Sequence, residues 1–399
     1  MKTLVTFLGR PHRNRAYDAV TYQFPDGRPR TSVFFGLLLA DYLEADRLLV
    51  LGTAGSNWDV LLEHHIQDSE DEEARLALIA ACDQSQVTPA LLDRIAPLLT
   101  RRTNRRTELC LIPDGLNDGE QAAIVTLLSN RLQAGEGVAF DVTHSFRHLP
   151  LLALAAAMYL ETVLGVQVGE IAYGLLDGDR SQAVMLTGLL QTLRWTQALD
   201  LFRQTGMSRP LGGLLAREGL ENKARQRLES MDFAVSTLQS ENARDAIRGF
   251  RPALKQLQSP WFSLFQDKWL AELQWADLIH RDQRELALAK KAGQARDYLR
   301  AVAWLMEGLI SRALRGHPQI MEYSIRENAK NTLTRDPAFA KLSKLRNQLV
   351  HGQNRSAARD HSTIAPLLAA EQNLRLQIEQ WLRDLPAQIA PGKLKAIGS

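Results

Sequence analysis

The chain has 399 residues, of which 45% are hydrophobic and 23% are charged. This composition is ordinary for a globular protein with more than one hydrophobic core, and it excludes a disordered or collagen-like chain. The formal net charge of +3 is small, so a polyanionic partner must be bound by local basic clusters rather than by a global field.

Cysteine usage and hydropathy indicate where such a protein works. The two cysteines, Cys82 and Cys110, are too few for a disulfide framework or a four-ligand zinc site, which favours a reducing compartment. The longest apolar run, residues 149–160, is too short to cross a bilayer. Because the N-terminus enters a strand without a signal sequence, we expect a cytoplasmic protein with no membrane partner.

Strands and helices alternate over the first 174 residues, which predicts a doubly wound α/β domain with a mostly parallel, Rossmann-like sheet. Residues 17–24 and 30–34 flank Pro25-Asp26-Gly27 and predict a β-hairpin. The other predicted strands are residues 3–8, 47–51, 108–112, 137–140, 168–173 and 183–186.

From residue 188 to the end the sequence shows almost only helical periodicity. We therefore predict a Rossmann-like domain over residues 1–187, a linking helix and break over 188–213, and an all-helical domain over 214–399. The break is expected between Gly206 and Gly213. The clearest amphipathic helices are predicted at residues 297–315, 339–350 and 363–385.

Three polar loops follow predicted strands at their carboxyl ends, where parallel sheets bind ligands. The turn at 9–15 is basic, and the loop at 52–58 has small residues that let a ligand approach the backbone. The loop at 141–147 carries hydroxyl, imidazole and guanidinium groups before a helix opened by Pro150, so it can bind an anion such as phosphate. Asp141 is expected to be a helix N-cap or a loop brace rather than a ligand group.

Each of these loops alone is more often an ordinary structural turn, but together they favour a phosphate-rich ligand. Because no Walker or G-x-G-x-x-G sequence is present, the expected ligand is neither ATP nor NAD. His144 and His148 lie four residues apart and could suggest a metal, yet no third ligand is evident. No metal or other cofactor is therefore expected.

The helical half contains Arg346-Asn347-Gln348-Leu349-Val350-His351. An arginine and a histidine at this spacing can cleave RNA without metal, since His351 can move a proton while Arg346 holds the charged phosphate. The bare pattern is weak because Arg312 and His317 repeat its spacing, but His351 ends an amphipathic helix and Gly352 can stop it. One histidine per chain is sparse for acid–base catalysis, so a symmetric dimer is expected to build the site. The simpler interpretation is a helix-end histidine beside a solvated arginine.

Together these segments resemble the CRISPR-associated Rossmann-fold (CARF) proteins with a C-terminal HEPN ribonuclease domain, which are accessory effectors of type III CRISPR systems. The resemblance spans both halves. Its most specific part is a D-x-T-H-G-x-R-x-L-P type loop at residues 141–150, with Ser145 in place of the family glycine. The further matching stretches are Phe7-Leu8-Gly9-Arg10, Val50-Leu51-Gly52-Thr53, Ser56-Asn57-Trp58, Ala172-Tyr173-Gly174, residues 195–206, and Arg346-Asn347 with His351.

The resemblance implies a homodimer whose Rossmann-like halves bind a cyclic oligoadenylate, the allosteric activator. It also implies that Arg346, Asn347 and His351 cut single-stranded RNA without metal, leaving a 2′,3′-cyclic phosphate and a 5′-hydroxyl. Trp58 can stack on adenine or equally belong to the core. The ligand-binding residues that the resemblance implies are Arg10, Thr53, Ser56, Asn57, Trp58, Thr143, His144, Ser145 and Arg147.

Two alternatives remain open at the level of sequence. The helical half can bind RNA or a protein partner without any chemistry, which would make the chain a non-catalytic sensor. The Rossmann-like half can also degrade its own activator slowly, with Thr53, Ser56 or Thr143 positioning the ring. Glu307, on a helix expected to pack beside that of Arg346, is expected to brace that helix rather than to catalyse.

Overall fold

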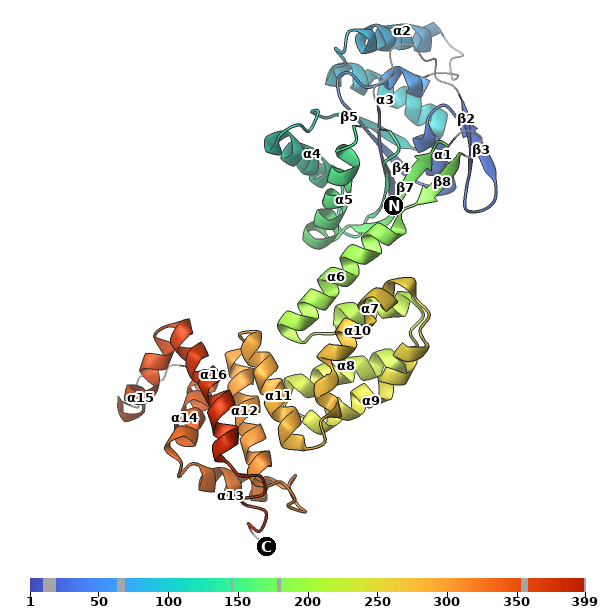
Figure 1. Cartoon of the computed structure of the whole chain (residues 1–399). Helices are drawn as coiled ribbons and strands as arrows, with labels where there is room; N and C mark the ends of the chain where they lie inside the picture. Colours follow the sequence, from blue (N-terminus) through green and yellow to red (C-terminus); the bar gives the residue numbers. More distant parts are fainter. Residues whose placement is uncertain (10–18, 63–68, 145, 178–180, 353–357, 398–399) are drawn as a thin grey trace. The chain divides into compact units, whose positions relative to one another are not determined.

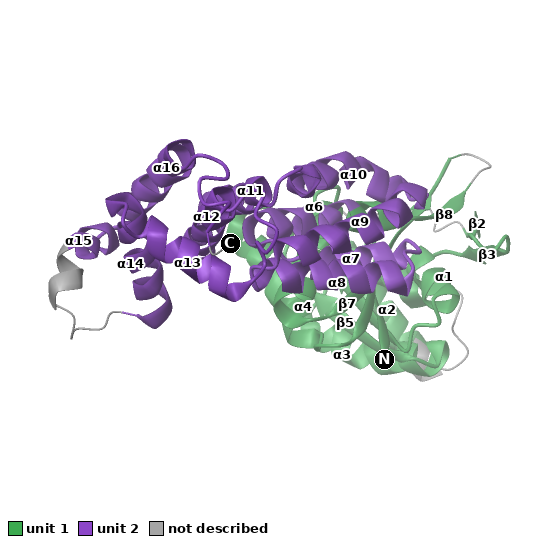
Figure 2. Ribbon diagram, turned by 90° about the horizontal axis from the view of Figure 1, so that it is seen from below, with its two compact units in different colours: residues 1–191 green, residues 192–399 purple. Residues whose placement is uncertain are grey.

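Two units divide the chain between Gln191 and Thr192 (Figure 2). The computed structural model describes residues 1–9, 19–62, 69–144, 146–177, 181–352 and 358–397. Helix α6 (Thr187–Thr205) runs through the division. Leu190 in this helix belongs to a core of the first unit, whereas Trp195 belongs to the core of the second.

An eight-stranded sheet organises the first unit (Figure 1). The strands are β1 (Lys2–Phe7), β2 (Val20–Gln23), β3 (Pro29–Ser32), β4 (Arg47–Gly52), β5 (Arg106–Leu111), β6 (Gly137–Asp141), β7 (Gln167–Leu175) and β8 (Gln182–Met185). Their order is β3-β2-β8-β7-β6-β1-β4-β5, and the five central strands from β7 to β5 are parallel. Strands β2 and β3 form an antiparallel hairpin, so the predicted mostly parallel sheet and the predicted hairpin are both confirmed.

The central strands are buried on both faces, because successive side chains point to opposite sides of a strand. Leu4 of β1 packs in one core and Val5 in the other. Helices α1 (Phe35–Tyr42), α2 (Ser69–Asp83) and α3 (Pro89–Thr103) supply the first core, and α4 (Asp118–Arg131) and α5 (Leu149–Tyr159) supply the second. Parallel sheets require such double coverage, which explains the continuous apolar strands in the sequence.

The direction of the sheet reverses at β1, whose two parallel neighbours are β4 and β6. The chain builds outward from β1 to β4 and β5, and then returns across β1 to β6 and β7. Open α/β sheets bind ligands beyond the carboxyl ends of their strands at such a switch point. The loops that follow β1, β4 and β6 therefore start side by side at the edge where a ligand is expected.

The second unit is entirely helical around one core, in which α12 (Tyr298–Ala313) is the most deeply buried helix. The other helices are α7 (Arg209–Arg217), α8 (Asn222–Ser236), α9 (Ser240–Gln256), α10 (Pro260–Glu272), η3 (Gln274–Asp277), α11 (Arg281–Gln294), α13 (Tyr323–Leu333), α14 (Pro337–His351), α15 (Ala358–Leu368) and α16 (Glu371–Gln388). None of the helices that the structure describes is long and apolar enough to cross a membrane.

Two predicted helix boundaries in this unit are wrong. The segment predicted as one helix over 363–385 contains the end of α15 and most of α16, because Ala370 adopts an extended conformation between them. The predicted break from Gly206 to Gly213 is shorter, since α7 already begins at Arg209. Pro210 is tolerated in the first turn of α7, where its missing N–H has no helical partner to lose.

Candidate functional site

Asp141, the last residue of β6, is fully buried where its loop begins. Its Oδ1 accepts hydrogen bonds from the backbone N–H of Thr143 at 2.9 Å and from the Thr143 hydroxyl at 2.5 Å. Its Oδ2 accepts from the hydroxyl of Thr6 on β1 at 2.6 Å. Asp141 is therefore the loop brace that the sequence favoured, and it fastens the loop to both strands at the switch point.

Thr143 is held from a third strand as well. Its hydroxyl oxygen accepts a hydrogen bond of 2.7 Å from the backbone N–H of Gly174 on β7. A side chain at position 174 has no room, because a Cβ there would lie 2.9 Å from Cδ2 of Phe35 and 3.0 Å from Cγ2 of Thr143. The backbone at Thr143 is thus positioned by β1, β6 and β7 together.

His144 lies half-buried on the ring of Phe34, with ring centroids 5.7 Å apart and planes 28° from parallel. Burial lowers the pKa of His144 and raises the pKa of Asp141, while the attraction between the two groups opposes both shifts. His144 is consequently neutral at neutral pH. Its Nε2 is buried and has no hydrogen-bond partner among the described residues, which leaves one ring nitrogen available to a ligand.

The remaining polar side chains of this loop differ in their access to solvent. Arg147 is exposed, so its guanidinium can bind an anion. His148 instead stacks on Phe146 at 5.7 Å and donates through Nε2 to the backbone oxygen of Asp114 at 2.8 Å. This bond joins the loop after β5 to the loop after β6, so His148 is a structural residue.

The loop after β4 is fastened by its own side chains. Ser56 Oγ accepts from the backbone N–H of Thr53 at 2.9 Å and donates to the Leu8 carbonyl at 3.1 Å. Trp58 is fully buried, and its indole N–H donates to the Thr53 carbonyl at 2.9 Å. The exposed fractions of Thr53 and Ser56 are only 4% and 2%. These three candidates for ligand contact are therefore internal braces in this structure, whereas Asn57 is only partly buried.

The small residues of this loop serve a neighbouring ring. A Cβ on Gly52 would lie 2.6 Å from Cζ2 of Trp58, so the glycine makes room for the indole. This corrects the suggestion that Trp58 stacks on adenine, because the core already holds its ring.

Two sequence-predicted candidates, Arg10 and Ser145, lie outside the described residues. Sequence reasoning did not select Thr6, Phe34 or Gly174 as site residues, although each contacts a selected one. Thr6 gave the best available signal, since a threonine in an otherwise apolar central strand must find a partner when it is buried.

Arg346, Asn347 and His351 lie in the last two turns of α14. Nη1 of Arg346 donates to Oδ1 of Asn347 at 3.2 Å. Arg346 is half-buried, whereas Asn347 and His351 are exposed. The helix end thus presents a guanidinium and an imidazole to a substrate.

The surroundings of these residues are those expected from the sequence. Leu342 and Leu345 are completely buried on the other face of α14, which confirms the predicted amphipathic helix. His351 is the last helical residue, and Gly352 follows with a φ of +71°, a conformation that favours glycine. By contrast, both ring nitrogens of His317 are hydrogen-bonded inside the fold, so the equally spaced pair with Arg312 is structural.

Glu307 on α12 is occupied by a neighbouring cation. Its Oε2 lies 2.5 Å from Nη2 of Arg326 on α13. Arg326 also donates to the hydroxyl of Ser311 at 3.2 Å. The carboxylate of Glu307 therefore fixes α13 to α12.

Comparison with known proteins agrees with this geometry. Residues 3–174 match the family model of the CARF domain of the CRISPR system endoribonuclease Csx1. The CRISPR-associated protein MJ1674 of Methanocaldococcus jannaschii is 22% identical over 283 residues, which cover 64% of this chain and 44% of that protein. The chain therefore spans less than half the length of the curated relative that it matches. A CARF domain implies cyclic-oligoadenylate sensing in CRISPR defence. On these grounds the chain belongs to the CARF-domain family of CRISPR-associated, type III accessory proteins.

Proposed function

We propose that the chain is a homodimeric endoribonuclease that cuts single-stranded RNA without metal after its first unit binds a cyclic oligoadenylate. The observation that carries this proposal is the exposed end of α14, which offers the guanidinium of Arg346 and the imidazole of His351 on a well-packed helix. A cation for the phosphate and a group that moves protons are what phosphodiester transfer requires.

The reaction is an attack by the ribose 2′-oxygen on the adjacent phosphorus. The bond from phosphorus to the 5′-oxygen breaks, so the products carry a 2′,3′-cyclic phosphate and a 5′-hydroxyl. His351 of one copy accepts the 2′-hydroxyl proton, and His351 of the second copy donates a proton to the leaving oxygen. Arg346 stabilises the charge on the phosphate, and Asn347 orients the guanidinium through their 3.2 Å hydrogen bond.

The sensing half offers groups suited to a phosphate-rich ring. The guanidinium of Arg147 is exposed, and Nε2 of His144 has no partner among the described residues. The buried hydrogen bonds between Asp141 and Thr143 hold the backbone between them in one arrangement. A ligand can shift the protein toward its active state only by binding that state more tightly, and helix α6 is a continuous connection through which the difference can act.

The test is an RNA cleavage assay in EDTA, with and without a panel of cyclic oligoadenylates. We expect cleavage only with an activating ring, and its loss in His351→Ala. Val350→Ala is the matched control, since Val350 is exposed on the same helix end. Activity that requires a metal, or that ignores every ring, would refute the nuclease proposal.

The same assay separates the alternatives. If the chain is a sensor without chemistry, His351→Ala keeps both ring binding and the binding of RNA or a partner. Slow degradation of the activator is measured with labelled ring and the Arg346→Ala, His351→Ala double variant, in which an intact ring at the end excludes it.

A further inference from the structure

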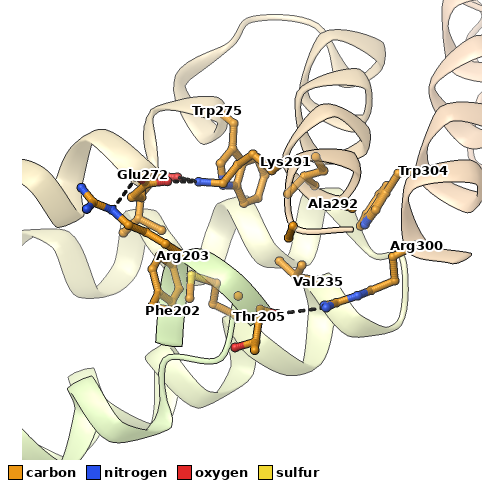
Figure 3. Close-up of a pocket in the computed structure, with 15 residues that line it drawn as sticks. Phe202, Arg203, Thr205, Val235, Glu272, Trp275, Lys291, Ala292, Arg300 and Trp304 are labelled. Atoms are coloured by element: carbon orange, nitrogen blue, oxygen red, sulfur yellow. Dashed lines mark hydrogen bonds and ion pairs between the residues drawn. The ribbon is translucent and has the colours of Figure 1, made fainter. Parts of the chain in front are cut away.

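A cavity of about 70 Å³ lies in the helical unit at the end of α6 (Figure 3). Its walls come from the last turn of α6 and from α8, η3, α11 and α12. Most of the lining is apolar and includes Phe202, Met231, Val235, Leu273, Trp275 and Trp304. Such a surface favours an apolar guest over water.

The rim of this cavity is charged. Oε1 of Glu272 lies 3.2 Å from Nε of Arg203, and its Oε2 lies 2.5 Å from Nζ of Lys291 (Figure 3). Burial acts to raise the pKa of Glu272, but the hydrogen bond and charge of Lys291, helped by Arg203, outweigh it and hold this pKa below its usual value. Glu272 is thus ionised and compensates part of the positive charge.

Arg300 forms the other side of the rim. Its Nε lies 2.5 Å from Oδ2 of Asp297, and its Nη2 donates to the Thr205 carbonyl at the end of α6 at 2.9 Å. Three rim cations therefore face the carboxylates of Glu272 and Asp297, which leaves one positive charge uncompensated. Nη1 of Arg300 and the two Nη atoms of Arg203 have no hydrogen bond to any residue that the structure describes.

We infer that this cavity binds a short-chain aliphatic carboxylate, with its alkyl chain inside and its carboxylate between Arg203 and Arg300. An engineered cavity of about 150 Å³ accommodates benzene, so a cavity about half that size suits a short chain better than a ring. The excess positive charge selects an anion, and guanidinium groups match the planar geometry of a carboxylate.

The position of the site gives such a ligand a defined mechanical effect. It would contact Arg203 on α6 and Arg300 on α12, and Arg300 already binds the last carbonyl of α6. Because Leu190 of α6 packs in the first unit, a bound carboxylate would fasten the helix that connects the two units. This inference does not depend on the nuclease proposal, and neither does its test.

The experiment is a titration of the full chain with pentanoate, followed by thermal unfolding and by tryptophan fluorescence. Trp275 and Trp304 line the cavity, so binding should change the emission as well as raise the unfolding midpoint. Pentylammonium has the same chain with the opposite charge and should do neither. An equal response to both compounds, or no response to millimolar pentanoate, overturns the inference.

Two variants locate the site. Arg203→Gln should weaken pentanoate binding roughly tenfold, because one charge-assisted hydrogen bond is lost. The side chain of Arg203 is 46% exposed, so this change leaves the fold intact. Ala292→Leu should fill the cavity and abolish the fluorescence response. Arg248→Gln, on an exposed face of α9, is the control for the lost charge, and a loss of binding equal to that of Arg203→Gln would contradict the assignment.

Discussion

The hydroxyl of Thr6 donates a 2.6 Å hydrogen bond to Oδ2 of Asp141, although 135 positions separate the two residues. Thr6 and Asp141 are partners in the parallel register of β1 and β6. The bond therefore closes the sheet at its switch point, where the ligand-binding loops begin. Since the carboxylate is completely buried, its stability depends on the hydrogen bonds that it accepts.

Asp141→Asn should destabilise the first unit. The amide keeps the shape of the side chain but directs an N–H group toward hydroxyl and backbone donors, so buried donors lose their acceptor. We expect the free energy of unfolding in urea to fall by about 1–3 kcal/mol. Asp177→Asn, at an exposed position of the same unit, should be neutral. Equal midpoints for both variants would show that the bonds to Asp141 contribute nothing.

Gly174→Ala should weaken cyclic-oligoadenylate binding. The new Cβ would displace Phe35 or Thr143, and overpacking of this kind costs about 1–3 kcal/mol, or roughly tenfold in affinity. Gly169→Ala on the same strand is the matched control, because a Cβ there meets only the Val138 carbonyl, at 3.9 Å. Calorimetric titration measures the difference, and equal affinities of the two variants would exclude a role for the Thr143 position.

His144 predicts a pH dependence of stability. Burial lowers its pKa in the folded state, whereas the unfolded chain takes up this proton near the ordinary value of 6.5. The first unit should therefore lose stability as the pH falls below that value, because only the unfolded state gains the proton. The raised pKa of Asp141 acts oppositely, but only in the window that begins at its ordinary 3.8.

The measurement is the urea midpoint of the first unit from neutral pH to about pH 5. His144→Asn should show a flatter dependence than the native chain, since the other histidines are unchanged. Parallel curves for the two proteins would mean that His144 titrates normally.

The elements that the sequence predicted well are those that local periodicity determines. The apolar strands β4 and β6 end at the polar loops as expected, and α14 ends at His351 before a left-handed glycine. The family resemblance added the sensing domain, and the domain comparison supports it. These features need no knowledge of distant contacts.

The features that the sequence left undetermined depend on packing between distant segments. A tryptophan beside glycines can face a ligand or the core, and only the close approach of Trp58 to Gly52 decides for the core. The role of Thr6 likewise depends on the register between β1 and β6. Propensity also failed at Ala370, where an extended alanine separates α15 from α16.

Arg47→Ala should be among the most damaging changes in the sheet. Arg47 is 4% exposed, lies 2.9 Å from Glu108 and 3.5 Å from Glu136, and donates to the Arg131 carbonyl. Removing it leaves carboxylates without their buried cation, a loss of about 3–5 kcal/mol. Arg106→Ala removes a 70% exposed partner of the same Glu108 and should cost at most about 1 kcal/mol. Similar urea midpoints for the two variants would disprove the importance of burial.

Glu307→Gln tests whether this residue braces the helices or takes part in the proposed cleavage. Because its carboxylate is bound to Arg326 at 2.5 Å and is 29% exposed, we expect a stability loss of at most about 1 kcal/mol. The cleavage rate should stay within about twofold, whereas His351→Ala should lose at least about a hundredfold. Glu327→Gln, which breaks a pair with Lys330 on α13, controls for the lost charge. A rate as low as that of His351→Ala, at unchanged stability, would place Glu307 among the catalytic groups instead.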